Sequence, residues 1–463
     1  NPVDAVWTDQ PARPLTPARA HAPCHAGVGS KEKRDAVAAE LAKSDADAVV
    51  LTAPDSICWL LNIRGGDVPN TPLTLCFALL DKDGGVDLFI DRRKLTAGAV
   101  DSLDSDIHAR EPDQLGPTLD EHGKAGHKIL LDPKSASSWI FDRLKASGAK
   151  IIKGTDPCTL PKSCKNEIEL AGTRSAHIRD GAALCRFLAW LSREAPSGGI
   201  DEISAAEMLY DFRSHNDLFQ GVSFDTISGA GPNGAIVHYH AEPASSRKLE
   251  PGMVYLVDSG GQYLDGTTDV TRTVFIPGPG SAPGLAPPSD ARDRFTRVLQ
   301  GHIALAQSRF PAGTSGGQLD TLARAPLWRI GCDYDHGTGH GVGSFLGVHE
   351  GPARIGKQGS TVALRPGMIM SNEPGYYKTG EYGIRIENLV IVIPSENPSD
   401  GRDMLAFETI TLAPIDHALI DVSLMTPNEI AWLDAYHDRV RETITPLVDP
   451  ETAQWLAAAT AAL

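Results

Sequence analysis

Basic charge is scarce in this chain of 463 residues, which carries 43 Lys and Arg against 59 Asp and Glu and has a formal net charge of −16. Nucleic acids and anionic membrane surfaces are polyanions and repel so acidic a protein. Long apolar runs are missing too, since no stretch approaches the roughly 20 residues that cross a bilayer. We therefore expect neither a nucleic acid nor a membrane among the partners of this protein.

Paired cysteines are also missing. The seven cysteines are an odd number, scattered from Cys24 to Cys332 without any Cys-x-x-Cys spacing. This pattern argues against a disulfide framework and against a structural zinc site, and a reducing, cytoplasmic location fits it best. The N-terminus has no signal-peptide pattern and begins with Asn1 instead of Met, which indicates processing or a piece of a longer protein.

The remaining composition is that of an ordinary globular protein, with 41% hydrophobic and 22% charged residues, in a chain too long for one compact core. Residues 1–30 are rich in Pro, Ala and His and predict a linker or surface strap. Residues 31–155 alternate helix and strand patterns and predict a small α/β domain. Its strands are expected at residues 48–51, 73–80, 86–90 and 129–131, and its helices at residues 33–43 and 137–146.

Residues 156–463 predict a second, larger domain. A long helix is expected over residues 167–193, with Asn166 as its N-cap. Strand hairpins are then expected at residues 223–275 and 338–415, and helices at residues 290–310 and 316–330 between them. The two hairpin blocks hint at an internal duplication. Thr426, followed by Pro and by Glu429 three residues later, predicts a capped start for the C-terminal helices.

The first acids that need an explanation are Asp258 and Asp269. Residues 254–258 have the pattern of a buried strand ending in Asp258, and residues 265–276 predict a second strand that carries Asp269. A hairpin between these strands would bring the two acids together. Two unpaired carboxylates side by side repel, so either a divalent cation lies between them or a base such as Arg272 neutralises one of them.

A second block delivers two more acids in the same way. Glu373 ends an apolar stretch, and Glu387 lies within the strand pattern of residues 382–392, on the same face as Arg385. Between the blocks, His340 lies in a segment whose glycines allow backbone and imidazoles to crowd around a ligand. The predicted metal-binding set is therefore Asp258, Asp269, His340, Glu373 and Glu387.

This set determines which ions would bind. Four carboxylates and one imidazole form an oxygen-rich site without thiolates, which suits Mn²⁺, Co²⁺ or Zn²⁺. Four negative charges balance two divalent cations. A water held between two such cations ionises near neutral pH and can attack a carbonyl carbon. The residues themselves thus point to dinuclear metal chemistry.

The order Asp, Asp, His, Glu, Glu resembles that of metallopeptidase family M24, which includes methionine aminopeptidase, prolidase and aminopeptidase P. The segments that look like cytosolic, eukaryotic-type aminopeptidase P are SGAGPNGAIVHY (228–239), DGTTDVTRT (265–273), HGTGHGVGSFLGVHEGP (336–352), EPGYY (373–377) and GIRIEN (383–388). The resemblance covers most of the chain. It implies an α/β (α+β) protein in which a creatinase-N-like domain (31–155) precedes a pita-bread catalytic domain with pseudo-twofold halves and C-terminal helices (156–463). It also identifies residues 1–30 as the linker that follows a first domain missing here.

The resemblance implies a metal role for each of the five predicted ligands. Asp258 and Asp269 bind one ion, and His340 and Glu373 bind the other. Asp269 and Glu387 bridge the two ions. The cofactor implied is a pair of divalent metal ions, with Mn²⁺ favoured over Zn²⁺ and Co²⁺.

The resemblance also implies substrate and catalytic roles. His238 and His336 contact the proline side of the substrate, and His349 contacts the substrate carbonyl and the tetrahedral intermediate. Glu373 carries a proton to the leaving nitrogen. Arg385 and Tyr377 complete the substrate site, with Arg385 orienting Glu387 or its neighbour. The residues expected to be catalytic are thus His238, His349 and Glu373.

The function implied is a metal-dependent Xaa-Pro aminopeptidase, which hydrolyses the bond between an N-terminal residue and a following proline by means of a metal-bridging hydroxide. Its partners would be peptides with proline in second position and a second copy of the chain in a homodimer. A prolidase restricted to Xaa-Pro dipeptides and a methionine aminopeptidase are the related alternatives. A non-catalytic or metal-free relative such as creatinase is disfavoured, because such relatives lose several of the five ligands.

Overall fold

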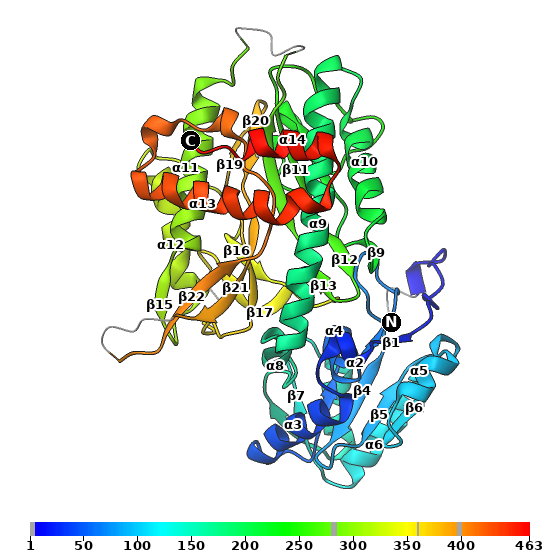
Figure 1. Cartoon of the computed structure of the whole chain (residues 1–463). Coiled ribbons are helices and arrows are strands. Elements are labelled where there is room, and N and C mark those ends of the chain that lie inside the picture. The colour runs from blue at the N-terminus through cyan, green and yellow to red at the C-terminus, as the bar shows by residue number, and fades with distance from the viewer. Residues whose placement is uncertain (1–4, 279–284, 359–360, 396–400) are drawn as a thin grey trace. The chain divides into compact units, whose positions relative to one another are not determined.

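The computed structural model describes residues 5–278, 285–358, 361–395 and 401–463 (Figure 1). It divides into two compact units, Asn1–Thr159 and Leu160–Leu463. The predicted boundary between residues 155 and 156 lies close to this division. Among the helices that the structure describes, none combines the length and the apolar character needed to cross a bilayer.

The first unit is built on a six-stranded mixed sheet with the order β6-β5-β4-β2-β7-β8. The strands are β2 (Ala48–Leu51), β4 (Phe77–Asp81), β5 (Val86–Phe89), β6 (Ile107–Arg110), β7 (Lys128–Leu131) and β8 (Lys150–Lys153). The helices are α3 (Ser30–Lys43), α4 (Pro54–Leu60), α5 (Ala97–Ser102), α6 (Leu115–Lys124) and α7 (Ser138–Ser147). The strand expected over residues 73–80 begins only at Phe77, because the side chain of Asp67 accepts the backbone N–H of Leu75 and the hydroxyl of Thr74.

Part of the segment predicted as a strap has regular structure. β1 (Arg19–Ala20) pairs antiparallel with β3 (Ile63–Arg64), and a short helix, α2 (Pro23–Ala26), follows. The first four residues of the predicted strap lie outside the described residues. That this segment is a linker after a missing domain stays a prediction.

Near its start the second unit has a 28-residue helix, α9 (Glu167–Glu194), which follows the short helix α8 (Thr159–Ser163). The prediction of Asn166 as its N-cap is confirmed, because the Asn166 side chain accepts the N–H groups of Ile168 and Glu169. The other long helices are α10 (Glu202–Ser214), α11 (Ser289–Ala306), α12 (Gly316–Trp328), α13 (Pro427–Ile444) and α14 (Pro450–Ala459). The predicted capping box at Thr426 is confirmed at the start of α13.

A three-stranded and a six-stranded sheet carry most of the residues of interest. One has the order β10-β11-β14, and the other the order β15-β22-β21-β18-β16-β17. Their strands are β10 (Ile227–Ala230), β11 (Val254–Ser259), β14 (Val270–Phe275), β15 (Arg309–Pro311), β16 (Gly339–Gly341), β17 (Glu350–Ile355), β18 (Ile369–Asn372), β21 (Asn388–Pro394) and β22 (Met404–Thr409). Small sheets are formed by β9 (Phe219–Val222), β12 (Gly261–Tyr263) and β13 (Gly266–Thr267), and by β19 (Gly375–Lys378) with β20 (Tyr382–Arg385).

Two predicted strands are interrupted, and an acid lies at each break. The strand expected over residues 265–276 splits into β13 and β14 on either side of Asp269, because β13 pairs with β12 and β14 pairs with β11. The strand expected over residues 382–392 splits at Glu387, whose N–H is accepted by the carbonyl of Thr271. β20 pairs with β19 and β21 pairs with β18, so the chain changes sheets at this point. The carboxylates of Asp269 and Glu387 therefore both lie at the ends of strands.

A buried core holds these strand ends in place. Phe295, Val298 and Leu299 of α11 pack in one apolar cluster with Ile384 of β20 and Leu433 of α13. Burying one such side chain stabilises the fold by about 1.5–3 kcal/mol. The acids thus project from a rigid framework, as a preformed metal site requires.

Candidate metal centre

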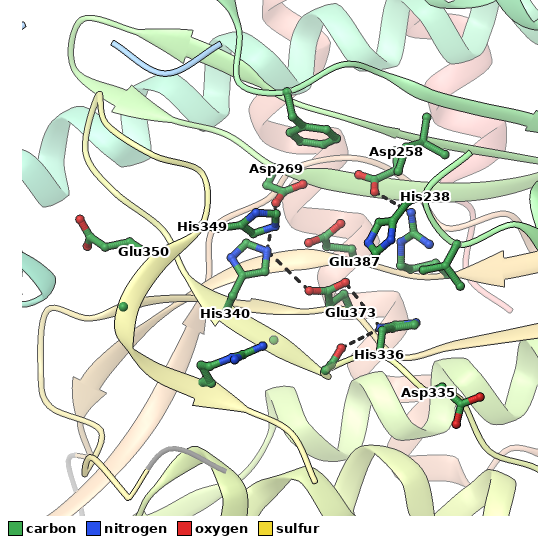
Figure 2. A pocket seen from close by; sticks show the side chains of 18 residues that line it. His238, Asp258, Asp269, Asp335, His336, His340, His349, Glu350, Glu373 and Glu387 are labelled. Carbon is green, nitrogen blue, oxygen red and sulfur yellow. Dashed lines mark hydrogen bonds and ion pairs between the residues drawn. The ribbon is translucent and has the colours of Figure 1, made fainter. Parts of the chain in front are cut away.

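A pocket of about 910 Å³ in the second unit collects the predicted ligands (Figure 2). All five predicted metal ligands line it, together with three further histidines: Asp258, Asp269, His340, Glu373, Glu387, His238, His336 and His349. Tyr377 is not among its lining residues. The structure therefore brings every predicted metal ligand into one cavity.

His340 presents one nitrogen to the acids. Its Nδ1 lies 2.9 Å from the carbonyl oxygen of Gly341, to which Nδ1–H donates. Its Nε2 lies 3.4 Å from Oδ2 of Asp269 and 3.5 Å from Oε1 of Glu373. A backbone acceptor on one ring nitrogen is the usual way in which a metal-binding histidine is oriented, since it leaves the other nitrogen free for the ion.

The acids lie close enough to share ions. Asp269, His340 and Glu387 offer ligand atoms that all lie within 4.8 Å of one another. Burial and the charges of neighbouring acids raise the pKa of Asp269 and raise that of Glu387 well above its ordinary value. Burial raises the pKa of Glu373 to about 7. Such shifts show how unfavourable this concentration of negative charge is without bound cations.

The hydrogen bonds of Asp258 identify the base that lies beside the first pair of acids. Its Oδ2 accepts a hydrogen bond of 2.6 Å from Nη2 of Arg385, while Oδ1 is buried without a hydrogen-bond partner in the described structure. Arg272, the base considered from the sequence, instead donates to the carbonyl oxygens of Thr271 and Glu387. The free Oδ1 atom is an unsatisfied acceptor of the kind that a metal ion would fill.

Arg385 links the acids to the rest of the site. Its Nε donates to the hydroxyl of Thr271 at 3.0 Å, and this hydroxyl donates to Oε2 of Glu387 at 2.7 Å. The geometry agrees with the predicted role of Arg385 in orienting Glu387 through a neighbour. It adds Thr271, which sequence reasoning did not include in the site.

His336 and Tyr377 are joined in one hydrogen-bonded chain. Nδ1–H of His336 donates to the Gly337 carbonyl at 2.7 Å, so Nε2 accepts the Tyr377 hydroxyl at 2.9 Å. The Tyr377 oxygen accepts Nη1–H of Arg385 at 2.7 Å. Burial, and then the charge of Arg385, lower the pKa of His336 to about 3. Because both of its nitrogens are engaged, a neutral His336 can contact a substrate only through its ring carbons.

The side chains of His238 and His349 are exposed and line the pocket. The ring of His349 lies edge-on to that of His340, with centroids 4.2 Å apart. Burial, and then the charge of His340, lower the pKa of His349 to about 4, so its imidazole is neutral at physiological pH. A neutral imidazole can donate one hydrogen bond to an oxygen on which negative charge develops.

Close packing explains why glycine stands on both sides of His340. A Cβ atom on Gly339 would lie 2.0 Å from the carbonyl oxygen of Ser371, and one on Gly341 would lie 2.3 Å from that of Glu350. β16 therefore fits between its neighbours only without side chains on both sides of the ligand. This explains the Gly-rich frame that the sequence displays.

Glu350 is a pocket residue that sequence reasoning did not single out. It is buried and forms ion pairs with Lys162, at 2.7 Å, and with Lys165. The two lysines lie about 185 residues earlier in the chain, so no local pattern could have revealed the contact. The pocket is completed by Asp335 and Arg354 and by the apolar side chains of Phe224, Ile227 and Val237.

The donor set fits a pair of divalent cations. It combines four carboxylates, one imidazole nitrogen oriented by a backbone carbonyl, and an unsatisfied carboxylate oxygen on Asp258. No thiol lines the pocket among the described residues, so the set is hard and suits Mn²⁺, Zn²⁺ or Co²⁺.

Metal uptake should depend steeply on pH. Burial alone would lower the pKa of His340, but its hydrogen bond with Asp269 and the charge of Glu373 raise it to about 9, so a proton must leave His340 before a metal binds. Glu373, with a pKa of about 7, is protonated below neutral pH and also competes with the ion. We expect the apparent Mn²⁺ affinity of chelator-stripped protein to be at least about tenfold weaker at pH 6 than at pH 8. Calorimetric titration at constant ionic strength measures this, and equal affinities at the two pH values would contradict it.

Three sequence profiles match the chain. That of Metallopeptidase family M24 matches residues 171–394, and that of the Creatinase/Prolidase N-terminal domain matches residues 9–169. That of the C-terminal region of peptidase_M24 matches residues 403–463.

Relatives of the chain match it over almost its whole length. The chain is 40% identical to "Aminopeptidase P2" of Arabidopsis thaliana, over 98% of this chain and 68% of the relative. It is 42% identical to a "Probable Xaa-Pro aminopeptidase P" of Coprinopsis cinerea, over 98% of this chain and 75% of the relative.

Solved structures give the same picture. An X-prolyl aminopeptidase from Caenorhabditis elegans, described as "a cytosolic enzyme with a di-nuclear active site", matches with a TM-score of 0.93 and 34% identity, over 100% of this chain and 75% of that one. A Xaa-Pro dipeptidase from Bacillus anthracis matches with a TM-score of 0.66 and 22% identity, over 84% of this chain and 99% of that one, which is a likeness of fold alone.

Proposed function

Because the chain belongs to metallopeptidase family M24, we propose that it is a metal-dependent Xaa-Pro aminopeptidase. The membership confirms the predicted fold, a creatinase-type α/β domain followed by a pita-bread catalytic domain. One observation carries the functional proposal: five acid and imidazole ligands converge in one pocket with three further histidines, in a chain about 40% identical to aminopeptidases of this specificity.

The ligands would divide between two ions. Asp258 and Asp269 would hold one ion, His340 and Glu373 would hold the other, and Asp269 and Glu387 would be shared by both. When bound, two divalent cations lower the pKa of a water and polarise the carbonyl of the scissile bond. The positions of Asp269 and Glu387 support the bridging role, because each residue lies where the chain passes from one sheet to another.

Glu373 is the residue proposed to move the proton. Proline is joined through a tertiary amide nitrogen, which has no N–H and needs a proton to leave as an amine. The Glu373 carboxylate takes up a proton during attack on the carbonyl and delivers it to this nitrogen. Its Oε1 accepts a hydrogen bond of 3.1 Å from the hydroxyl of Ser371, which holds the carboxylate in place.

The remaining histidines would hold the substrate. The neutral imidazole of His349 donates to the carbonyl oxygen as negative charge develops there. His238 and the carbon edge of His336 contact the proline ring, beside the apolar side chains of Phe224, Ile227 and Val237. Tyr377 and Arg385 would fix His336 and the acids through their hydrogen bonds, Arg385 from the wall of the pocket and Tyr377 from behind His336.

Three finer points belong to the same proposal. Mn²⁺ is the favoured ion among those that the donor set accepts. A cytosolic location is supported by the description of the Caenorhabditis elegans relative and by the scattered cysteines. The homodimer stays a prediction.

Hydrolysis of short peptides tests the proposal directly. We expect the Mn²⁺-loaded protein to release the first residue of Ala-Pro-Gln-amide and to leave Ala-Ala-Gln-amide intact, with products resolved by chromatography. The dipeptide Ala-Pro separates the prolidase alternative, because a dipeptidase would cleave it in preference to the longer peptide. Preference for the dipeptide, or cleavage of the alanine control at a similar rate, would contradict the assignment.

A further inference from the structure

Arg354 projects into the pocket from β17 for a reason that its neighbours explain. Ala353 and Ile355 are buried in an apolar core, and successive residues of a strand point to opposite faces. Arg354 therefore faces away from that core. It lies opposite His340 in the strand register, is exposed, and lines the pocket.

The guanidinium of Arg354 has no hydrogen-bond or ion-pair partner among the residues that the structure describes. Of the other charged residues of the pocket, Arg385 binds Asp258 and Glu350 is held by Lys162 and Lys165. The remaining acids of the cluster are the proposed metal ligands. The pocket thus contains one uncompensated cation close to the proposed site of reaction.

The chemistry of the substrate limits what this cation can bind. Resting on the proposed function, the first substrate residue carries a free ammonium group, which Arg354 repels. A carboxylate further along the peptide is attracted, and the planar guanidinium can bind it through two parallel N–H groups. The other charged rim residue, Asp335, has the same sign as such a carboxylate and cannot bind it. Figure 2 shows Asp335 and Glu350 on opposite sides of the acid cluster.

We infer that Arg354 selects peptides with a carboxylate beyond the proline. The carboxylate is supplied by an acidic third residue or by the C-terminus of a tripeptide. Arg354 is thereby a specificity-determining residue of the pocket. Because Arg354 is exposed, the preference should have the size of an exposed ion pair, about two- to fivefold in kcat/KM.

Matched peptides test this inference. Ala-Pro-Glu-amide and Ala-Pro-Gln-amide differ only in the charge of the third side chain, and Ala-Pro-Gln as the free acid places the carboxylate at the C-terminus. Glu-Pro-Gln-amide serves as the control with its acid before the proline. We expect wild-type protein to prefer the two peptides with a carboxylate beyond proline over Ala-Pro-Gln-amide, and to show no such preference for Glu-Pro-Gln-amide. The preference should disappear in about 0.5 M salt.

Substitutions assign the preference to one side chain. In Arg354→Gln the kcat/KM ratio of Ala-Pro-Glu-amide to Ala-Pro-Gln-amide should fall to about one, and Arg354→Lys should keep part of it. Arg329→Gln removes an equal charge from an exposed position outside the pocket and should leave the ratio at its wild-type value. A ratio of one in wild-type protein, or an unchanged ratio in Arg354→Gln, would overturn the inference. Failure of wild-type protein to cleave Ala-Pro-Gln-amide would instead overturn the proposed function.

Discussion

Replacing Glu387 by Gln is expected to remove at least one metal ion per chain and nearly all activity. The substitution keeps the size of the side chain and an acceptor for the Thr271 hydroxyl, which now bonds Oε2 at 2.7 Å. It removes the negative charge that would bridge the two ions. Losing one partner of a buried charge pair costs about 3–5 kcal/mol. At 1.36 kcal/mol per factor of ten, this corresponds to roughly 10²–10⁴-fold in metal affinity.

The measurement is metal content by mass spectrometry together with kcat/KM on Ala-Pro-Gln-amide. Glu381→Gln is the matched control, because Glu381 lies in the exposed turn of the neighbouring hairpin and pairs only with Lys378 in the described structure. It should keep wild-type metal content and activity. A Glu387→Gln protein with both ions and wild-type activity would contradict the bridging role.

Folding can be separated from metal binding in the same variant. Burial and the neighbouring acids raise the pKa of Glu387 well above that of an unfolded glutamate. A carboxylate with a raised pKa in the folded state stabilises the fold less as pH rises through that range, because the folded chain then has to give up a proton that it holds tightly. Metal-free Glu387→Gln should therefore melt no lower than metal-free wild-type protein at pH 8. A lower melting temperature would mean that the lost activity reflects misfolding.

Replacing His349 by Ala should lower kcat on the order of 10²- to 10³-fold, the usual effect of removing one donor to a developing oxyanion. Metal content should stay at the wild-type value, because His349 is not among the five proposed ligands. This combination distinguishes a group that acts on the substrate from one that holds an ion.

Steady-state kinetics and metal analysis on the same preparation measure both effects. His240→Ala, at an exposed histidine outside the pocket, is the control. His349→Gln retains an N–H donor and should lose less activity than His349→Ala. Loss of metal in His349→Ala, or kcat unchanged within error, would contradict the proposed role.

Local patterns predicted several elements closely. The apolar run of residues 48–51 is a strand with those bounds, and Asn166 and Thr426 cap helices as their side-chain chemistry requires. The convergence of the five proposed ligands could also be predicted from the sequence, because buried charges at the ends of apolar segments are costly unless something binds them.

Long-range pairing could not be predicted in the same way. The apolar alternation of Ile384 and Ile386 stops at Asn388 and an apolar run resumes at Leu389, but this interruption alone does not reveal that the chain changes sheets there. The choice of Arg385 over Arg272 as the partner of Asp258 depends on how β20 meets β11 and β14. The neutralisation of Glu350 by Lys162 and Lys165 joins segments far apart in the chain.

The most direct test of the dinuclear centre is an anomalous-scattering map from crystals of Mn²⁺-loaded protein, recorded on both sides of the manganese absorption edge. We expect two peaks per chain roughly 3.5–4 Å apart, lying among Asp258, Asp269, His340, Glu373 and Glu387. A saturated crystal with no peak there, or with those side chains bound only to other protein groups, would contradict the metallopeptidase assignment.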